Sequence, residues 1–173
     1  MLDHALGGFH HLEVDREIWD RIEDTLPGVT QAAHASRAFL RRAVVLLIAE
    51  AGITQFLDIG AGLPTCGSVY EIATWACPTA RVASADLDPI VIEQTRSMQA
   101  HDRRTTMIEA DLRCPAEIIY HPDVLDLLDF GEPVAVLTAG VLHYLPDTDE
   151  VAAIIQTLAE LAMTVVIGPT RTA

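Results

Sequence analysis

The chain has 173 residues, half of them hydrophobic, which is enough for one sizeable core and too few for two ordinary domains. Its 25 acidic and 11 basic residues give a net charge of −14, so the average field repels nucleic acid and anionic lipid surfaces. The first residues lack the pattern of a secretory signal, and no apolar run reaches the ~20 residues that span a bilayer. We therefore expect a cytoplasmic protein without nucleic-acid or membrane partners.

Two helices are predicted before the first strand. The first covers about residues 14–26, where apolar residues recur at helical spacing, and it ends at Pro27. The second covers about residues 36–51 and is followed by a glycine suited to a left-handed cap. Within one structural domain, we expect residues 1–52 to form a helical cap and residues 53–173 to form the core.

Strands and helices then alternate along the chain. Short apolar runs predict five strands, at residues 55–59, 81–85, 105–109, 133–138 and 164–168. Capping signals at Ser68, Asp88 and Asp147 begin three of the intervening helices, and Pro115 begins a shorter one. This alternation predicts an α/β fold with a Rossmann-like, doubly wound parallel sheet covered on both faces.

A glycine-rich turn follows the first predicted strand. Gly60 and Gly62 permit unusual backbone angles and let a ligand approach the main chain closely. The dinucleotide fingerprint fails because Thr65 occupies the position of its third glycine, which argues against a nucleotide-binding oxidoreductase. Asp58, two residues before Gly60, suits the ammonium of S-adenosylmethionine. The alternative for Asp58 is that it caps its own turn.

The second strand ends at Asp86, where a carboxylate can accept hydrogen bonds from both ribose hydroxyls of a nucleoside. Leu87 could pack on an adenine face. Asp88 is better explained as the N-cap of the next helix, because Pro89 suits the first helical position.

Two later strand ends carry further candidates. Asp111 could accept a hydrogen bond from the adenine amino group while Leu112 flanks the ring, or Asp111 could cap the turn before Pro115. His143 follows the fourth strand and could act as a general base, although a packed or turn-capping role is more usual for histidine. No spacing of cysteines and histidines indicates a metal site.

On these residues the chain resembles class I S-adenosylmethionine-dependent methyltransferases, and specifically a bacterial family described as S-adenosyl methyltransferase. The motifs that carry the resemblance span residues 6–8, 14–17, 36–43, 55–65, 86–89, 110–113 and 141–144. The resemblance implies that Gly60, Gly62, Asp86 and Asp111 contact the cofactor. It also implies that the amino-terminal helices, with the loop at Gly7 and Gly8, cover the pocket.

Two departures from the family pattern matter. Phe9 stands where a basic residue is expected after the paired glycines. The full fold has seven strands, whereas this sequence ends soon after the fifth, so the last two strands are expected to be missing. An exposed fifth strand favours a homodimer. We expect a methyltransferase acting on a small-molecule acceptor; the alternative is a non-catalytic or truncated module that binds S-adenosylmethionine or S-adenosylhomocysteine.

Overall fold

The structure is a computed structural model that describes residues 2–64, 67–161 and 164–166. Two expectations fall outside the described residues, namely the position of Thr65 and the end of the predicted fifth strand at residues 167–168.

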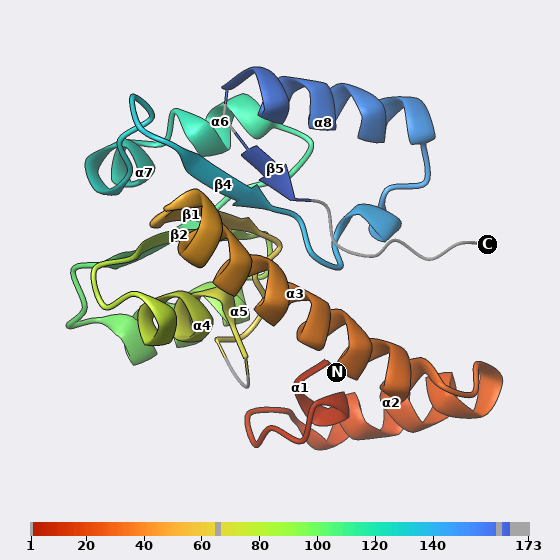
Figure 1. Ribbon diagram of the computed structural model, residues 1–173. Helices are drawn as coiled ribbons and strands as arrows, with labels where there is room; N and C mark the ends of the chain where they lie inside the picture. Colours follow the sequence, from red (N-terminus) through yellow and green to blue (C-terminus); the bar gives the residue numbers. More distant parts are fainter. Residues whose placement is uncertain (1, 65–66, 162–163, 167–173) are drawn as a thin grey trace.

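A parallel sheet of five strands organises the described chain (Figure 1). The strands are β1 (Gln55–Ile59), β2 (Arg81–Asp86), β3 (Thr105–Glu109), β4 (Val134–Leu137) and β5 (Thr164–Val166). Their order is β3-β2-β1-β4-β5, and every pair is parallel. The predicted α/β, doubly wound fold is confirmed. The order reverses direction between β1 and β4, which is where such sheets bind ligands.

The helices cover both faces of the sheet, as Figure 1 shows. The described helices are α1 (Leu2–Ala5), α2 (Glu13–Thr25), α3 (Val29–Ala51), α4 (Val69–Ala76), α5 (Pro89–Gln99), α6 (Pro115–Ile119), α7 (Pro122–Leu127) and α8 (Thr148–Leu161). One apolar cluster joins α3 and α4 to the sheet around Phe56 and Val82. The other cluster joins α6, α7 and α8 to the opposite face around Leu57 and Ala83. In β1, β2 and β4 the two clusters use alternate residues, as strand geometry requires.

The capping signals begin helices where the sequence predicts them. Ser68 precedes α4 and its hydroxyl accepts a hydrogen bond from the N–H of Glu71 at 3.2 Å. Asp88 precedes α5 and its carboxylate accepts from the N–H of Ile90 at 2.9 Å, with Pro89 in the first helical position. Asp147 accepts from the N–H of Asp149 at 2.8 Å before α8. Each cap satisfies an otherwise unpartnered helix donor.

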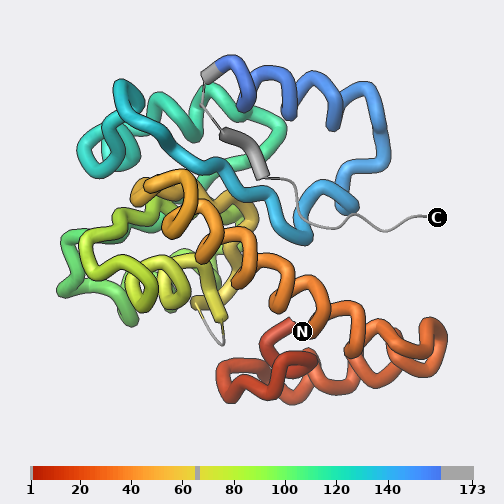
Figure 2. Tube along the Cα trace, viewed as in Figure 1, coloured from red at the N-terminus to blue at the C-terminus, as the bar shows by residue number. Residues whose placement is uncertain are grey.

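The second predicted helix is wrong at its start. α3 begins at Val29 instead of Ser36, directly after Gly28, which adopts a left-handed conformation with φ of 92°. The extension gives α3 23 residues, so its amino-terminal half projects beyond the sheet. The short helix α1 and α2 pack along this projecting half (Figure 2). Within the described residues, no helix is both long and apolar enough to cross a membrane.

Candidate functional site

The structure brings the predicted site residues to one edge of the sheet. Asp58 lies near the end of β1 and Asp86 at the end of β2, while Asp111 follows β3 and His143 follows β4. Because all strands are parallel, these carboxyl ends meet at the same edge. The projecting half of α3, with α1 and α2, lies beyond this edge (Figure 1).

The glycine turn is built for close packing on one side and for open space on the other. Gly60 and Gly62 have φ values of 72° and 66°, a region that side chains disfavour. A Cβ on Gly60 would lie 2.6 Å from the Cβ of Val141, in the loop after β4. A Cβ on Gly62 would meet no atom within 4 Å. Gly60 therefore allows the turn to pack on the β4 loop, and Gly62 leaves main chain accessible to a ligand.

Asp86 fixes this turn in place. One carboxylate oxygen accepts a hydrogen bond from the N–H of Gly62 at 2.8 Å, and the other accepts from the N–H of Asp88 at 3.0 Å. Each carboxylate oxygen has a second lone pair with which to accept from a ligand hydroxyl. The residue predicted to hold a ribose thus lies against the glycine turn.

Asp58 is buried, at 6% exposure, on the same face of the sheet as Asp86. Burial raises the pKa of Asp58 to about 7; the nearby Arg37 charge opposes the rise, and the Asp86 charge adds to it. A carboxylate in this environment is stabilised by a cationic partner because desolvation disfavours its charged form. Asp58 is therefore suited to bind an ammonium group.

A small cavity of about 10 Å³ lies beneath the turn, with room for about one water molecule. Polar side chains line much of it, including Asp58, Ser84 and Thr95. The Thr95 hydroxyl is buried and has no hydrogen-bond partner among the described residues. The cavity extends the polar surroundings of Asp58 into the interior.

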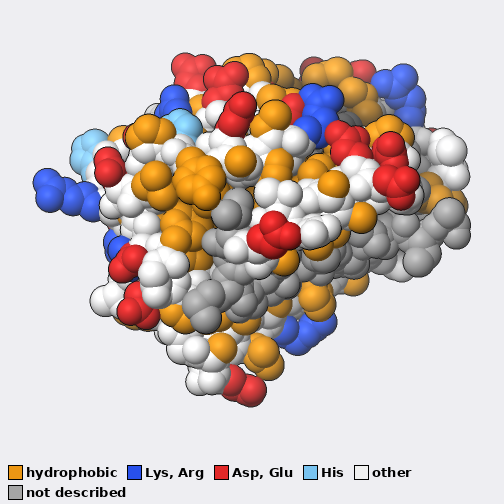
Figure 3. All heavy atoms as spheres, turned by 90° about the horizontal axis from the view of Figure 1, so that it is seen from above, with side chains coloured by type: hydrophobic (Ala, Val, Ile, Leu, Met, Phe, Trp, Pro, Cys, Tyr) orange, Lys and Arg blue, Asp and Glu red, His pale blue; other side chains and the backbone are white. Residues whose placement is uncertain are grey.

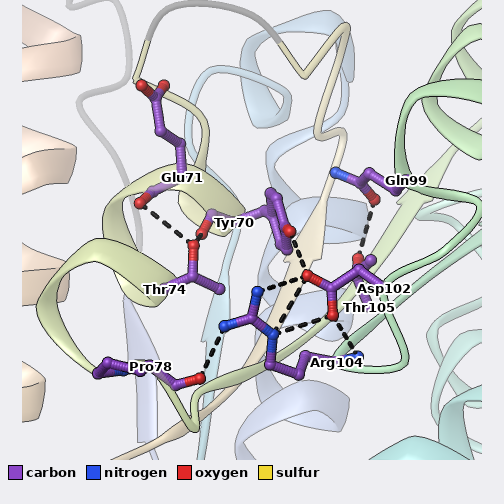
Figure 4. A network of polar contacts seen from close by, with 8 residues as sticks. All are labelled: Tyr70, Glu71, Thr74, Pro78, Gln99, Asp102, Arg104 and Thr105. Carbon is purple, nitrogen blue, oxygen red and sulfur yellow. Dashed lines mark hydrogen bonds and ion pairs between the residues drawn. The ribbon is translucent and has the colours of Figure 1, made fainter.

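A hydrogen-bonded network supports one wall of this cavity (Figure 4). The Tyr70 hydroxyl donates to the carboxylate of Asp102, which also pairs with the guanidinium of Arg104 at 2.5 Å. Arg104 donates a further hydrogen bond to the carbonyl oxygen of Pro78 at 2.7 Å. The network joins the start of α4 to the turn before β3, and so holds Tyr70 against the cavity.

The adenine-binding candidates have different surroundings. Leu87 is 58% exposed, whereas Leu112 is 7% exposed and packs in the core beneath β3. Asp111 accepts from the backbone N–H of Arg113 at 2.9 Å and forms an ion pair with its guanidinium at 2.5 Å. Hydrogen bonding to Arg113 lowers the pKa of Asp111. Asp111 therefore caps its own turn, and adenine recognition by Asp111 and Leu112 stays a prediction.

His143 lies in a short 3₁₀ turn, Leu142–Tyr144, after β4. Its side chain is exposed, and its ring centroid is 4.2 Å from that of Tyr144. The same loop contains Val141, which packs on Gly60, so the turn holding His143 is tied to the glycine turn. This placement permits a proton-transfer role.

Arg37 is a candidate that the sequence did not identify. In the sequence it stands with Arg41 and Arg42, as on the solvated face of a helix, but in the structure its guanidinium reaches the backbone at Gly67, five positions after Gly62. One of its nitrogens donates to the carbonyl oxygen of Gly67 at 3.3 Å, and its charge acts on Asp58. Arg41, one turn along α3, lies instead over the Trp75 ring at 5.3 Å.

The amino-terminal loop is held by a buried carboxylate. Asp3 is 5% exposed and accepts from the N–H of His10 at 2.8 Å, with the His11 ring 3.0 Å away. A Cβ on Gly8 would lie 1.9 Å from an Asp3 oxygen, so a larger residue there would displace the Asp3 carboxylate. Phe9 is 91% exposed. The paired glycines therefore fold the loop tightly and leave Phe9 at the surface.

A larger hollow of about 330 Å³ lies elsewhere, beside α7 and the start of β2. It is lined by Arg81, whose guanidinium donates to the carbonyl oxygen of Leu127 at 2.8 Å. This is the amino-terminal edge of the sheet, opposite the edge where doubly wound folds bind ligands. We therefore place the candidate site at the glycine turn.

Solved structures of other proteins closely resemble this chain. A crystal structure of a candidate methyltransferase from Thermobifida fusca superposes with a TM-score of 0.87 at 39% identity, covering 93% of this chain and 60% of that one. A DUF574 family protein from Streptomyces avermitilis superposes with a TM-score of 0.85 at 36% identity, covering 93% and 62%. The more distant WbdD structure, at 16% identity and a TM-score of 0.54, covers 78% of this chain and 28% of WbdD and shares the fold alone.

This chain thus spans about 60% of the length of the two closely similar proteins. Among curated proteins, none matches it. The profile of a family described as S-adenosyl methyltransferase matches residues 1–166, which is nearly the whole sequence. The chain therefore belongs to the S-adenosyl methyltransferase family.

Proposed function

We propose that this protein binds S-adenosylmethionine at the glycine turn and transfers its methyl group to a small-molecule acceptor. The observation that carries the proposal is that Asp58 and Asp86 lie on one sheet face, close to the open main chain at Gly62. These groups match the ammonium and the ribose of the cofactor, and its sulfonium would supply an activated methyl group. Membership of the family supports the same assignment.

The chain's own residues have distinct roles in this proposal. The buried Asp58 holds the ammonium, and Asp86 accepts from the ribose hydroxyls while keeping the turn in place. Leu87 offers an exposed apolar surface for adenine. His143, on the loop beside Gly60, accepts a proton from the acceptor, a role that general-base chemistry requires only if the acceptor is protonated.

Binding is tested by titration calorimetry with S-adenosylmethionine and S-adenosylhomocysteine. We expect both to bind, and a nicotinamide dinucleotide to leave their affinity unchanged. Absence of binding by both ligands to folded protein would refute the proposal. Binding of the dinucleotide at the same site would favour the oxidoreductase alternative.

Methyl transfer needs a separate assay, because binding alone also fits a non-catalytic module. Transfer of a labelled methyl group from S-adenosylmethionine to compounds of a cell extract, fractionated by size, would identify the acceptor class. The net charge of −14 and the acidic side chains spread over the face in Figure 3 favour acceptors that are not polyanions. Label found only in nucleic acid would contradict the acceptor proposed here. A His143→Ala variant that binds cofactor but transfers no label would support the proton-accepting role.

We also propose that β5 pairs with its counterpart in a second copy. In the described sheet, β5 pairs with β4 and lies at the end of the strand order. Strands at an edge present unpaired backbone groups that favour association. Size-exclusion chromatography with light scattering measures the outcome, and a monomer at all concentrations would contradict it.

A further inference from the structure

The cofactor's methionine end carries a carboxylate beside its ammonium, and the structure assigns this carboxylate a partner. We propose that Arg37 of α3 binds the methionine carboxylate of S-adenosylmethionine, beside the ammonium held by Asp58. The inference rests on the proposed function, since it concerns a further contact in the same site.

The length of α3 brings Arg37 to the level of the carboxyl end of β1. α3 ends at Ala51 and β1 begins at Gln55, so the helix leads back along the sheet towards the strand's carboxyl end. Arg37 lies fourteen positions before Ala51 in the helix, a rise of about 21 Å, compared with about 16 Å for the five residues of β1. The hydrogen bond from Arg37 to the Gly67 carbonyl, at 3.3 Å, shows that the side chain turns inward there.

The charges of Arg37 and Asp58 are complementary to an amino-acid group. The two residues interact electrostatically, and Asp58 is buried while Arg37 is half-buried. An α-ammonium and its carboxylate are attached to the same carbon, so they need an anion and a cation at neighbouring positions. A guanidinium is the side chain best suited to a carboxylate, because its planar fork can donate two parallel hydrogen bonds.

The start of α4, the other place to bind a carboxylate, is already occupied by the chain's own groups. The Ser68 hydroxyl accepts from the N–H of Glu71, and the Glu71 carboxylate accepts from the N–H of Gly67 at 2.8 Å. Glu71 thus places a negative charge at the helix start, where it repels a second carboxylate. We therefore assign the carboxylate to Arg37 and not to the start of α4.

Decarboxylated S-adenosylmethionine provides the test, because it keeps the adenosine, sulfonium and ammonium but lacks the carboxylate. We expect the wild-type protein to bind S-adenosylmethionine about 10 to 100-fold more tightly than the decarboxylated analogue, as measured by calorimetry. In Arg37→Met, binding of S-adenosylmethionine should weaken by that factor while binding of the analogue changes little. The ratio of the two affinities should then approach one.

Arg41→Met is the matched control, since Arg41 lies on the same helix but over Trp75. This variant should keep the wild-type ratio, and Arg37→Lys should restore part of it. If Arg37 only balances the charge of Asp58, Arg37→Met will alter both affinities equally and keep the ratio, which overturns the inference.

A poorly folded variant leaves the proposal testable on the wild-type protein alone, where a ratio near one also overturns it. Failure of the proposed function is distinguishable, because S-adenosylmethionine, S-adenosylhomocysteine and the analogue would then all fail to bind wild-type protein. In that case the assignment of Arg37 falls as well.

Discussion

Asp86 at the end of β2 accepts a hydrogen bond from the backbone N–H of Gly62, 2.8 Å away in the turn after β1. The same carboxylate accepts from the N–H of Asp88 through its other oxygen. The residue proposed to bind the ribose therefore also sets the shape of the turn at which the cofactor is proposed to bind. Loss of Asp86 affects both tasks at once.

Replacement of Asp86 by alanine should weaken binding of S-adenosylhomocysteine by about 10 to 100-fold, because charge-assisted hydrogen bonds contribute about 1.5 to 3 kcal/mol. Calorimetry measures the change. Asp88→Ala is the control: it removes the N-cap of α5 and should lower the free energy of unfolding by about 1 kcal/mol with no change in affinity. Equal affinities for Asp86→Ala and wild type would remove Asp86 from the site.

Gly60→Ala should destabilise the protein more than Gly62→Ala. Both residues have positive φ, which costs a side chain about 1 to 2 kcal/mol, but only the Gly60 Cβ would collide with Val141. We expect a loss of about 2 to 4 kcal/mol for Gly60→Ala and about 1 kcal/mol for Gly62→Ala, measured by urea denaturation. A Val141→Gly substitution should restore part of the loss at position 60. Equal losses at both glycines would contradict the contact.

Binding should depend on pH through Asp58. Its pKa is about 7 in the folded protein, with Arg37 on α3 and Asp86 on β2 as the charged groups that act on it. The ammonium requires the ionised carboxylate, so affinity should fall about 10-fold between pH 8 and pH 6. Calorimetry at several pH values measures this fall, and Asp58→Asn should bind more weakly and lose the dependence. An unchanged pH profile in Asp58→Asn would assign the dependence to another group.

Ionisation of Asp58 should strengthen cofactor binding but lower the stability of the folded protein. Because its folded pKa lies above the usual value of 3.8, folding is favoured at low pH, and this advantage is lost as the pH rises towards 7. Asp58→Asn should therefore unfold at higher urea concentration than wild type at pH 8, by about 1 to 3 kcal/mol in free energy. At pH 4 the two proteins should differ little. A destabilised variant at pH 8 would show that Asp58 is stabilising there.

The Tyr70–Asp102–Arg104 network should contribute to stability and not to affinity. Hydrogen bonding to Arg104 holds the pKa of Asp102 below its usual value of 3.8, so its contribution is present at neutral pH and is lost as the pH falls below about 4. Asp102→Ala should cost about 1 to 2 kcal/mol at pH 7, measured by urea denaturation. Asp126→Ala, at an exposed site, should change stability little. A weakened cofactor affinity in Asp102→Ala would show that the network also shapes the site.

Most of the fold could be predicted because strand runs and caps are local signals. β1 and β3 match their predicted bounds, as each is a short apolar run between turn residues. The start of α3 could not be predicted from the sequence. Ser36 looks like an N-cap, although nothing between Gly28 and Ser36 interrupts a helix. α7 and the 3₁₀ turn after β4 are too short to show a periodic pattern.

The candidate site also contains residues that the sequence predicts and one that it does not. The alternation of strands and helices predicts that Asp58 and Asp86 meet at one sheet edge, because their strands are neighbours and parallel. Arg37 could not be found from the sequence, since its contact with Gly67 spans 30 residues and its neighbours on the helix are solvent-facing arginines. The pattern along a helix gives the spacing of its residues, whereas the packing of α3 on the sheet decides which of them face the turn.

α3 crosses from the core to the amino-terminal helices without a glycine or proline in its 23 residues. Sharp bends in helices arise mainly at proline, at glycine or where the helical hydrogen bonding is interrupted, so we expect this helix to be continuous and stiff. It sets the distance between the sheet and the amino-terminal helices that pack on its projecting half. The wall that these helices form beyond the carboxyl edge of the sheet is thus held by one continuous element.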